Sequence, residues 1–404
     1  MLLPHEVTEP HPALRGVPDT SGSFTLSKPW RPAWAEVDLN AIRHNVGLLA
    51  RLVAPAGLMA VVKADGYGHG SVAAAYAALE SGATWLGVAL VEEGVELRDA
   101  GIDAPILLLS QPPFEAARAI VDARLTPVVH SHRFVDALAK AAADAGAVDP
   151  QPVHLKVDTG MHRIGCSPSE ALDLAPAIKK HRELHLQGLL THFAVADEPD
   201  NPYTARQLAI FEAVRKELAR SGIRPSILHA ANSAGALNVP EARYDMVRCG
   251  ISIYGIAPAA DLEGRLRLKP ALSLKARVSY VRHLVAGERL SYGLRYELDV
   301  PSTVVTIPVG YADGVPRRLG EVGGEVLIGG RRRPIAGAIT MDQLLVDLGP
   351  TSVNGDVEIG TEVVLLGSQG DETITAAEWA AKLGTIPYEV CCGIGDRVPR
   401  RYQG

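Results

Sequence analysis

Residues 61–70, VVKADGYGHG, place a single lysine between an apolar run and a cluster of three glycines within five residues. The apolar run, Leu58–Val62, predicts a buried strand, and Lys63 follows at its carboxyl end. A charged lysine is costly to bury there, so its amine is expected to be either paired or neutral. A neutral amine at a glycine-lined mouth can attack a carbonyl and hold a cofactor as a Schiff base. The structural alternative is a lysine whose stem covers the strand end while its amine reaches water.

Size and composition are those of a globular enzyme. The 404 residues are 47% hydrophobic and 21% charged, which suits about two domains and a large core. The net charge of −6 offers no basic surface, and no apolar run has the length needed to cross a bilayer. We therefore expect neither nucleic acid nor a membrane as a partner.

The first residues and the cysteines bear on location. Residues 1–28 lack the basic start and apolar stretch of a signal peptide, and they predict a flexible tail. Four cysteines, Cys166, Cys249, Cys391 and Cys392, form neither a disulfide framework nor a metal-ligand spacing. We expect a cytoplasmic protein without a bound metal.

Strand and helix patterns alternate over residues 29–269. Helical patterns cover 92–100, 114–122, 133–145, 168–180 and 205–221. A strand at Trp34–Leu39 precedes a helix that Asn40 could cap. The alternation predicts a parallel sheet closed into a (β/α)8 TIM-like barrel. An open doubly wound sheet is the alternative, but no G-x-G-x-x-G follows the first strand. The eight strands expected in the barrel are Leu58–Val62, Trp85–Leu90, Pro105–Leu109, Thr126–Val129, Val153–Val157, Leu186–Thr191, Ser226–His229 and Met246–Ile251.

Residues 270–404 follow a different pattern. Runs such as Leu272–Val281 and Thr303–Val309 alternate apolar and polar residues between turns rich in Gly and Asp. Only Ala376–Leu383 looks helical, and Gly384 is a plausible stop for it. This segment predicts a second, mostly β domain.

Polar residues gather where the predicted barrel strands end, and the carboxyl ends of barrel strands are where such enzymes build their sites. Each has an ordinary structural alternative: His192 as a core histidine, Asn232 and Ser233 as a helix cap, and Arg248 as the partner of Asp245. Their coincidence on one rim favours a functional site.

Nine motifs, in order along the chain from about Trp34, resemble those of the alanine racemase family. That family depends on pyridoxal 5'-phosphate and combines a barrel with a β domain in a head-to-tail homodimer. The motifs are VVKADGYGHG (61–70), KVDTGMHRIG (156–165), THFAVADE (191–198), HAANSAGAL (229–237), VRCGISIYG (247–255), SYG (291–293), GYADG (310–314), TMDQ (340–343) and PYEVCCGIGDRVPR (387–400).

The resemblance implies alanine racemase activity: reversible interconversion of L- and D-alanine by two-base proton transfer on a pyridoxal-phosphate aldimine. The product D-alanine would serve peptidoglycan. Lys63 would form the internal aldimine and act as one base, and Tyr292 of the other subunit would act as the second. The residues implied to hold the cofactor are Lys63, Tyr67, Arg163, His192, Ser233, Arg248, Gly250, Ile251 and Tyr388.

The resemblance assigns further supporting roles. Arg163 and Met341 would bind the substrate carboxylate, Met341 from the partner subunit. His229 would lie behind Arg248, and Lys156, carbamylated in several relatives, would orient Arg163. Two positions depart from the family: His162 stands where relatives often have glycine, and Thr340 where many have cysteine. The residues implied to line the approach channel are Tyr311, Arg317, Asp342 and Asp197.

Three other functions remain open at this point. A broader amino-acid racemase acting on serine would share the fold. A decarboxylase of the same barrel predicts an acidic group where Arg248 stands, because an acid would keep the pyridine nitrogen protonated whereas arginine cannot accept that proton. A non-catalytic pyridoxal-phosphate carrier would have the barrel alone, without Tyr292.

Overall fold

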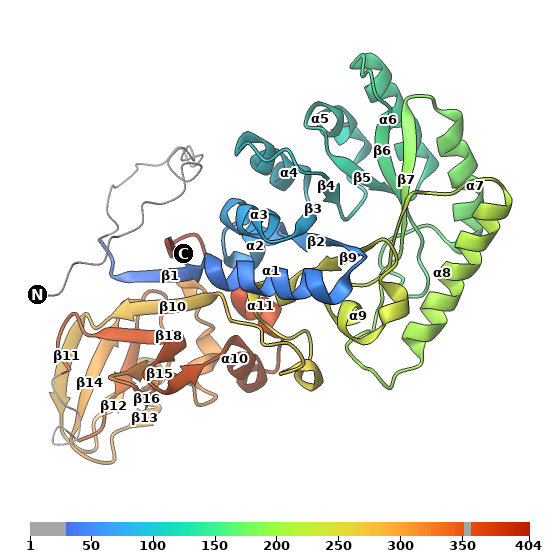
Figure 1. The fold of residues 1–404 in the computed structure, drawn as a ribbon. Helices are drawn as coiled ribbons and strands as arrows, with labels where there is room; N and C mark the ends of the chain where they lie inside the picture. The colour runs from blue at the N-terminus through green and yellow to red at the C-terminus, as the bar shows by residue number, and fades with distance from the viewer. Residues whose placement is uncertain (1–29, 351–356) are drawn as a thin grey trace, which may run out of the picture.

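The computed structural model describes residues 30–350 and 357–404, which form a barrel and a second, mostly β domain (Figure 1). The tail predicted at residues 1–28 lies outside the described residues. Among the described residues, no helix combines the length and apolar character that crossing a bilayer requires.

The predicted barrel is confirmed. Eight parallel strands follow one another in chain order around it, with β9 beside β2. The strands are β2 (Gly57–Val61), β3 (Ala83–Val88), β4 (Ile106–Leu108), β5 (Thr126–Val129), β6 (Gln151–Lys156), β7 (Leu184–Leu190), β8 (Ile227–His229) and β9 (Met246–Cys249). The helices of this domain are α1 (Leu39–Val53), α2 (Lys63–Gly68), α3 (Ser71–Glu80), α4 (Val91–Asp99), α5 (Ala117–Asp122), α6 (His132–Asp144), α7 (Pro168–Lys180), α8 (Tyr203–Arg220) and α9 (Ser233–Asn238).

Asp245 helps to join β8 to β9 at the barrel's seam. The ladder between β8 and β9 is incomplete, and Asp245 spans the gap just before β9. Its backbone N–H donates to the Leu228 carbonyl at 3.1 Å, and its carboxylate accepts from the Leu228 N–H at 2.8 Å. Its carbonyl accepts from Gly57 N–H at 2.8 Å. Asp245 is therefore occupied with backbone, and it is not the partner of Arg248 that the sequence left open.

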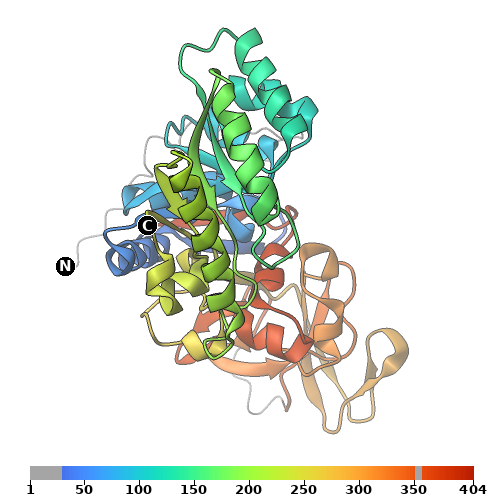
Figure 2. The same cartoon turned by 90° about the vertical axis from the view of Figure 1, so that its right-hand side faces the viewer.

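The first strand departs from the prediction. β1 (Ala33–Asp38) falls within the range expected for the barrel, but it pairs antiparallel with β10 (Leu272–Arg277) and parallel with β20 (Arg400–Gln403). Both of these strands belong to the second domain, so the described part of the chain begins in that domain, forms the barrel and returns to the second domain. Helix α1 carries the chain from one domain to the other (Figures 1 and 2). Asp38, rather than Asn40, caps α1 by accepting the Ala41 N–H at 3.0 Å.

The second domain is mostly β, as predicted. Its main sheet has the order β16-β15-β18-β10-β1-β20, with β19 beside β18, and β11-β14-β17 form a smaller sheet. Helix α10 (Ala376–Leu383) ends at Gly384, whose φ of 70° is left-handed, as expected of the stop. Helix α11 (Pro387–Cys392) was not predicted from the sequence. The remaining strands are β11 (Tyr280–Leu284), β12 (Arg289–Leu290), β13 (Tyr296–Glu297), β14 (Ser302–Ile307), β15 (Glu325–Ile328), β16 (Arg331–Pro334), β17 (Leu344–Asp347), β18 (Glu362–Gln369) and β19 (Glu372–Ile374).

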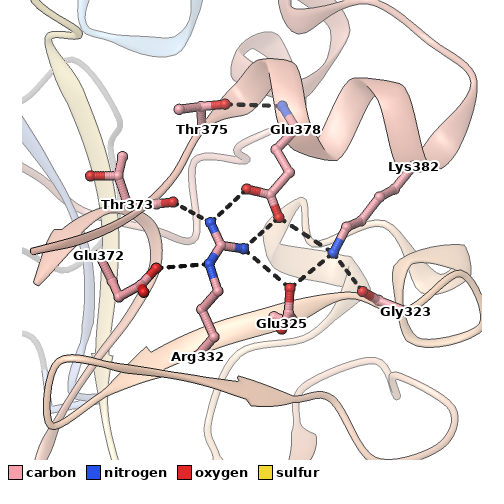
Figure 3. Close-up of polar contacts among 8 residues, drawn as sticks. All are labelled: Gly323, Glu325, Arg332, Glu372, Thr373, Thr375, Glu378 and Lys382. Carbon is pink, nitrogen blue, oxygen red and sulfur yellow. Dashed lines mark hydrogen bonds and ion pairs between the residues drawn. The ribbon is translucent and has the colours of Figure 1, made fainter.

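An ion-pair network ties α10 to this sheet (Figure 3). The Arg332 guanidinium on β16 contacts three carboxylates: Glu378 at 2.8 Å, Glu372 at 2.9 Å and Glu325 at 3.1 Å. Lys382 adds a second cation, 3.1 Å from Glu325. These carboxylates raise the pKa of Arg332, and the network joins three strands and a helix that lie apart in the sequence.

Candidate active site

Five barrel strands deliver polar side chains to one rim. Lys63 follows β2, Lys156 ends β6, and His192 follows β7. His229 ends β8 and Arg248 lies in β9. All five strands are parallel neighbours around the barrel, so their carboxyl ends face the same side. The clustering expected from the strand ends is therefore present.

The turn after Lys63 is left-handed. Ala64, Asp65, Gly66 and Tyr67 have φ of 50–60° and ψ of 38–54°, so the backbone makes a left-handed helical turn. Such a conformation costs about 1–2 kcal/mol for each non-glycine residue, and strain of this kind concentrates at functional sites. The turn connects the end of β2 to α3, and the Tyr67 side chain within it is buried.

A carboxylate from α4 holds this turn. Glu93 Oε1 accepts the Ala64 N–H at 2.6 Å, while its Oε2 accepts the N–H groups of Ala89 and Leu90 at 2.7 and 3.0 Å. Sequence reasoning missed this residue. Glutamates at the start of a helical pattern were its only signal, because nothing local indicates which distant N–H a carboxylate will reach.

Burial and neighbouring cations favour neutral amines in the site. The pKa of Lys63 is lowered by burial and then by the Arg163 guanidinium, while Glu93 opposes the shift. Lys156 is only 5% exposed, and burial followed by Arg248 and Arg163 lowers its pKa to about 7. Its amine reaches a single described acceptor, the Leu109 carbonyl, at 3.3 Å. Burial and these cations therefore favour the neutral form of both amines.

A small hollow lies beside the Lys156 amine. It lies between β6, β7 and the loop that carries Arg163. Arg163 itself is exposed, and within the described residues its side chain has no hydrogen-bond partner. The hollow is lined by Lys156, Val157, Asp158, Met161, Arg163, Ile164, Thr191 and His192.

Arg248 is 4% exposed and almost fully hydrogen-bonded by the protein. Its Nη1 donates to His229 Nδ1 at 3.1 Å and to the His229 carbonyl at 3.0 Å. Its Nη2 donates to His192 Nδ1 at 3.1 Å and to the carbonyls of Thr191 and Ala230 at 2.8 and 2.9 Å. Among the described residues, Nε–H has no acceptor, yet that nitrogen is not sealed from solvent. One N–H therefore remains for a ligand.

The contacts of Arg248 also bear on the protonation of His192 and His229. Arginine only donates, so His192 Nδ1 accepts from Arg248 and the ring carries its proton on Nε2. Burial, reinforced by Arg248, lowers the pKa of His192 well below its ordinary value. Burial likewise lowers the pKa of His229, with His154 and Arg248 adding to the effect. Both rings are neutral at neutral pH.

Tyr67, Ser233 and Gly250 meet beside Arg248. Ser233 Oγ accepts the Gly250 N–H at 3.0 Å, and a side chain at Gly250 would place its Cβ 2.4 Å from the Tyr67 hydroxyl. Tyr67 also packs near Tyr388 of α11, with ring centroids 6.1 Å apart. Burial raises the pKa of both phenols, that of Tyr388 to about 12, so both hydroxyls keep their protons and can donate. Ile251 follows Gly250 and is buried.

The residues predicted from the second domain lie apart from this cluster. Tyr292 lies between β12 and β13 in the sequence, and Figure 1 shows these two strands at the end of that domain away from the barrel. Its side chain is 73% exposed, and that of Met341 is 52% exposed. Met341 is anchored near Tyr311, because the Tyr311 N–H donates to the Thr340 carbonyl at 3.0 Å. Asp342 pairs with Arg397 at 2.7 Å. A single chain therefore does not bring Tyr292 to Lys63.

The fold and this rim define a two-domain barrel enzyme with a lysine amine of lowered pKa at its mouth. Models of the "Alanine racemase, N-terminal domain" and the "Alanine racemase, C-terminal domain" match residues 37–258 and 271–402. The chain belongs to the alanine racemase family, whose members are isomerases.

Relatives and solved structures agree with this membership. The chain is 50% identical to the alanine racemase of Symbiobacterium thermophilum over 93% of its length and 98% of the relative. It is 43% identical to that of Desulfovibrio desulfuricans, over 92% of this chain and 98% of the relative. Among solved structures, alanine racemase of Clostridium difficile superposes with a TM-score of 0.88 at 36% identity, covering 93% and 97% of the two chains. The Bacillus anthracis enzyme, described with bound L-Ala-P, has a TM-score of 0.86 at 36% identity, with 93% and 96% covered.

Proposed function

We propose that this chain interconverts L-alanine and D-alanine as a homodimer, with pyridoxal 5'-phosphate as its cofactor. The observation that carries the proposal is that a lysine amine of lowered pKa lies on the same rim as a buried arginine that keeps one N–H free. The relatives' names and the L-Ala-P bound to one of them support alanine as the substrate.

The residues fit this cofactor. When bound, pyridoxal phosphate would withdraw electrons from the Cα of an attached amino acid and so make its proton removable. Lys63 would hold it covalently, since its lowered pKa favours the neutral amine that attack on a carbonyl requires. Gly250 packs against the Tyr67 hydroxyl with no room for a side chain, and that hydroxyl keeps its proton and would donate it in a hydrogen bond to a phosphate. Ser233, Ile251 and Tyr388 surround that position.

Arg248 favours racemisation over decarboxylation. A guanidinium donates and cannot accept a proton, so Arg248 would hydrogen-bond a ring nitrogen without letting it become protonated. Arg248 would therefore weaken electron withdrawal by the bound cofactor, which would favour return of a proton to Cα over loss of a carboxyl group. An acid in place of Arg248 would have supported a decarboxylase.

Racemisation requires a base on each face of Cα. Lys63 would serve one face, and Tyr292 from a second copy of the chain would serve the other. Support comes from exposure: Tyr292, Leu294 and Met341 leave large apolar surfaces open, as interfaces do. The Ser291 hydroxyl donates to the Ala338 carbonyl at 2.6 Å, which keeps the Tyr292 turn beside the segment leading to Met341. Met341 would then offer its N–H to the substrate carboxylate, and Arg163 its guanidinium.

The cellular setting is part of the proposal. All four cysteines are unpaired, which suits a reducing cytoplasm, and D-alanine made there would serve peptidoglycan. Racemisation assays with alanine, serine and lysine would distinguish alanine specificity from the broader racemase. Equal turnover of serine would contradict an alanine-specific pocket.

Lysine attachment has a direct test. Wild-type protein loaded with pyridoxal phosphate should show an absorption band that borohydride abolishes, and Lys63→Ala should never form it. The exposed Lys180→Ala serves as the control and should behave as wild type. A borohydride-sensitive band in Lys63→Ala would refute the assignment of Lys63.

Sharing of the site between subunits is tested by mixing two inactive variants. A hybrid dimer of Lys63→Ala and Tyr292→Phe has one doubly defective site and one intact site if Tyr292 acts across the interface. Equal mixing should then restore about a quarter of wild-type activity, because about half the dimers are hybrids. No recovery, after native mass spectrometry has shown that hybrids formed, would place Tyr292 elsewhere.

A further inference from the structure

A chain of side chains runs from Arg248 into the barrel interior, beyond the residues assigned above. His229 Nε2 lies 2.8 Å from His154 Nδ1, and His154 Nε2 lies 3.3 Å from Gln187 Oε1. His154 and His229 are fully buried, and Gln187 is half-buried. The series Arg248–His229–His154–Gln187 is called the relay below.

The hydrogen-bond directions of the relay follow from its first and last members. Arg248 can only donate, so His229 Nδ1 accepts and Nε2 carries the proton. That Nε2–H donates to His154 Nδ1, which leaves the His154 proton on Nε2. This proton meets the carbonyl oxygen of the Gln187 amide, which only accepts. Each ring is therefore neutral and in a single tautomer, with every nitrogen used.

Packing holds His154 in this orientation. The Trp85 ring lies 5.4 Å from it, centroid to centroid. On the neighbouring strand, a Cβ at Gly188 would lie 2.4 Å from His154 Nδ1. Gly188 does not adopt a left-handed backbone, so its lack of a side chain serves this contact and not a turn. The strand alternation that points Lys156 inward points His154 to the same face.

We propose that His154 and Gln187 are positioning residues for Arg248. By fixing the tautomer of His229, they keep its Nδ1 as an acceptor and so hold the guanidinium in the plane that presents Nε–H to the ligand. The effect of this role on catalysis rests on the proposed function. The tautomers of the histidines do not depend on that function.

The tautomers are tested by long-range ¹H–¹⁵N NMR on cofactor-loaded protein labelled at histidine. His192, His229 and His154 should each show a proton on Nε2 alone. A proton on Nδ1 of His229 or His154 would overturn the relay, whether or not the protein racemises alanine. Failure of racemisation with all three tautomers as expected would instead count against the proposed function.

The positioning role is tested by a set of variants. His154→Leu leaves the His229 Nε2–H without an acceptor and should lower kcat by about tenfold, as for one lost buried hydrogen bond. The KM for alanine should change little, and His229 should lose its single tautomer. His154→Asn restores an acceptor and should recover most of kcat. Wild-type kcat together with an unchanged His229 spectrum in His154→Leu would overturn the proposal.

Two further variants address folding and specificity. Gln187→Met removes the last acceptor with little change in volume, so it tests the relay if His154→Leu fails to fold, and His154 should then lose its single tautomer. His185→Asn, an exposed histidine on the same strand, should leave kcat and the three spectra unchanged. Equal effects of Gln187→Met and His185→Asn would refute a role for Gln187.

Discussion

Replacing Lys156 by methionine should stabilise the protein at low pH. Lys156 is 5% exposed, and burial, Arg248 and Arg163 lower its pKa from 10.5 to about 7. The difference corresponds to about 5 kcal/mol, since each factor of ten is about 1.4 kcal/mol. Below pH 7 the folded chain holds this amine as a buried charge, and about 5 kcal/mol is the stability lost there. Methionine has a similar length and no charge, so Lys156→Met removes the penalty.

The pH dependence separates this effect from packing. Between the folded value of about 7 and the unfolded value of 10.5, the unfolded chain binds the extra proton, so wild-type stability rises with pH. The advantage of Lys156→Met should therefore be largest near pH 6 and shrink by about 1.4 kcal/mol for each pH unit above 7.

Urea unfolding of cofactor-free protein in CO₂-free buffer measures the difference between Lys156→Met and wild type. Lys180→Met, at an exposed position, should show no such pH dependence. An advantage of Lys156→Met that is equal at about pH 6 and pH 9 would refute the reasoning, because only packing could then explain it.

The reaction of Lys156 with carbon dioxide gives a second test of its neutral amine. A neutral Lys156 amine can add CO₂ and release a proton, which gives a carbamate anion beside Arg163 and Arg248. Bicarbonate should then stabilise the wild type and leave Lys156→Met unchanged. Labelled bicarbonate should give a carbamate ¹³C signal in the wild type that the variant lacks; its absence would leave Lys156 unmodified and refute the carbamate.

Three other substitutions have defined outcomes. Gly250→Ala would place a methyl group 2.4 Å from the Tyr67 hydroxyl. Overpacking of this kind should weaken pyridoxal-phosphate binding by about tenfold to a hundredfold, as measured by equilibrium dialysis. An unchanged affinity would refute the close approach. Arg332→Leu removes the centre of the network in Figure 3 and should lower the free energy of unfolding, measured with urea, by about 1–3 kcal/mol. The loss should be smaller in about 1 M salt, because salt screens the ion pairs. A loss that does not depend on salt would contradict an electrostatic origin. Glu93→Gln removes the charge that opposes the pKa shift of Lys63 and weakens the hold on Ala64. It should therefore move the pH profile of cofactor attachment to lower pH, and an unmoved profile would exclude that electrostatic effect.

Local patterns were enough for the barrel strands and for several site residues. Short apolar runs such as that before Lys63 predict strands, because a buried parallel strand is apolar on both faces. Their carboxyl ends share one rim in any closed parallel sheet, which is why His192 and Arg248 could be placed near Lys63. Gly384 was predicted as a helix stop, since glycine adopts the left-handed conformation without strain.

Contacts between side chains that are distant in the sequence could not be predicted from local patterns. The Arg248 side chain had several possible partners, and only the folded barrel shows that it bonds two histidines and three carbonyls while Asp245 bridges the seam. His154 looked like one residue of an apolar run. Its alternation with Lys156 was the available signal, but its partner His229 lies 75 residues away.

The sequence by itself therefore determined the two-domain organisation, the strands of the barrel and the identity of its rim residues, because these depend on periodicity and on the residue at each strand end. The tertiary structure alone decided that β1 joins β10 and β20, that Glu93 holds the left-handed turn after Lys63, and that Tyr292 faces outward. The physical reason is separation along the sequence. Strand pairing and buried hydrogen bonds depend on contacts between segments that are distant in the sequence, and these contacts exist only in the folded chain.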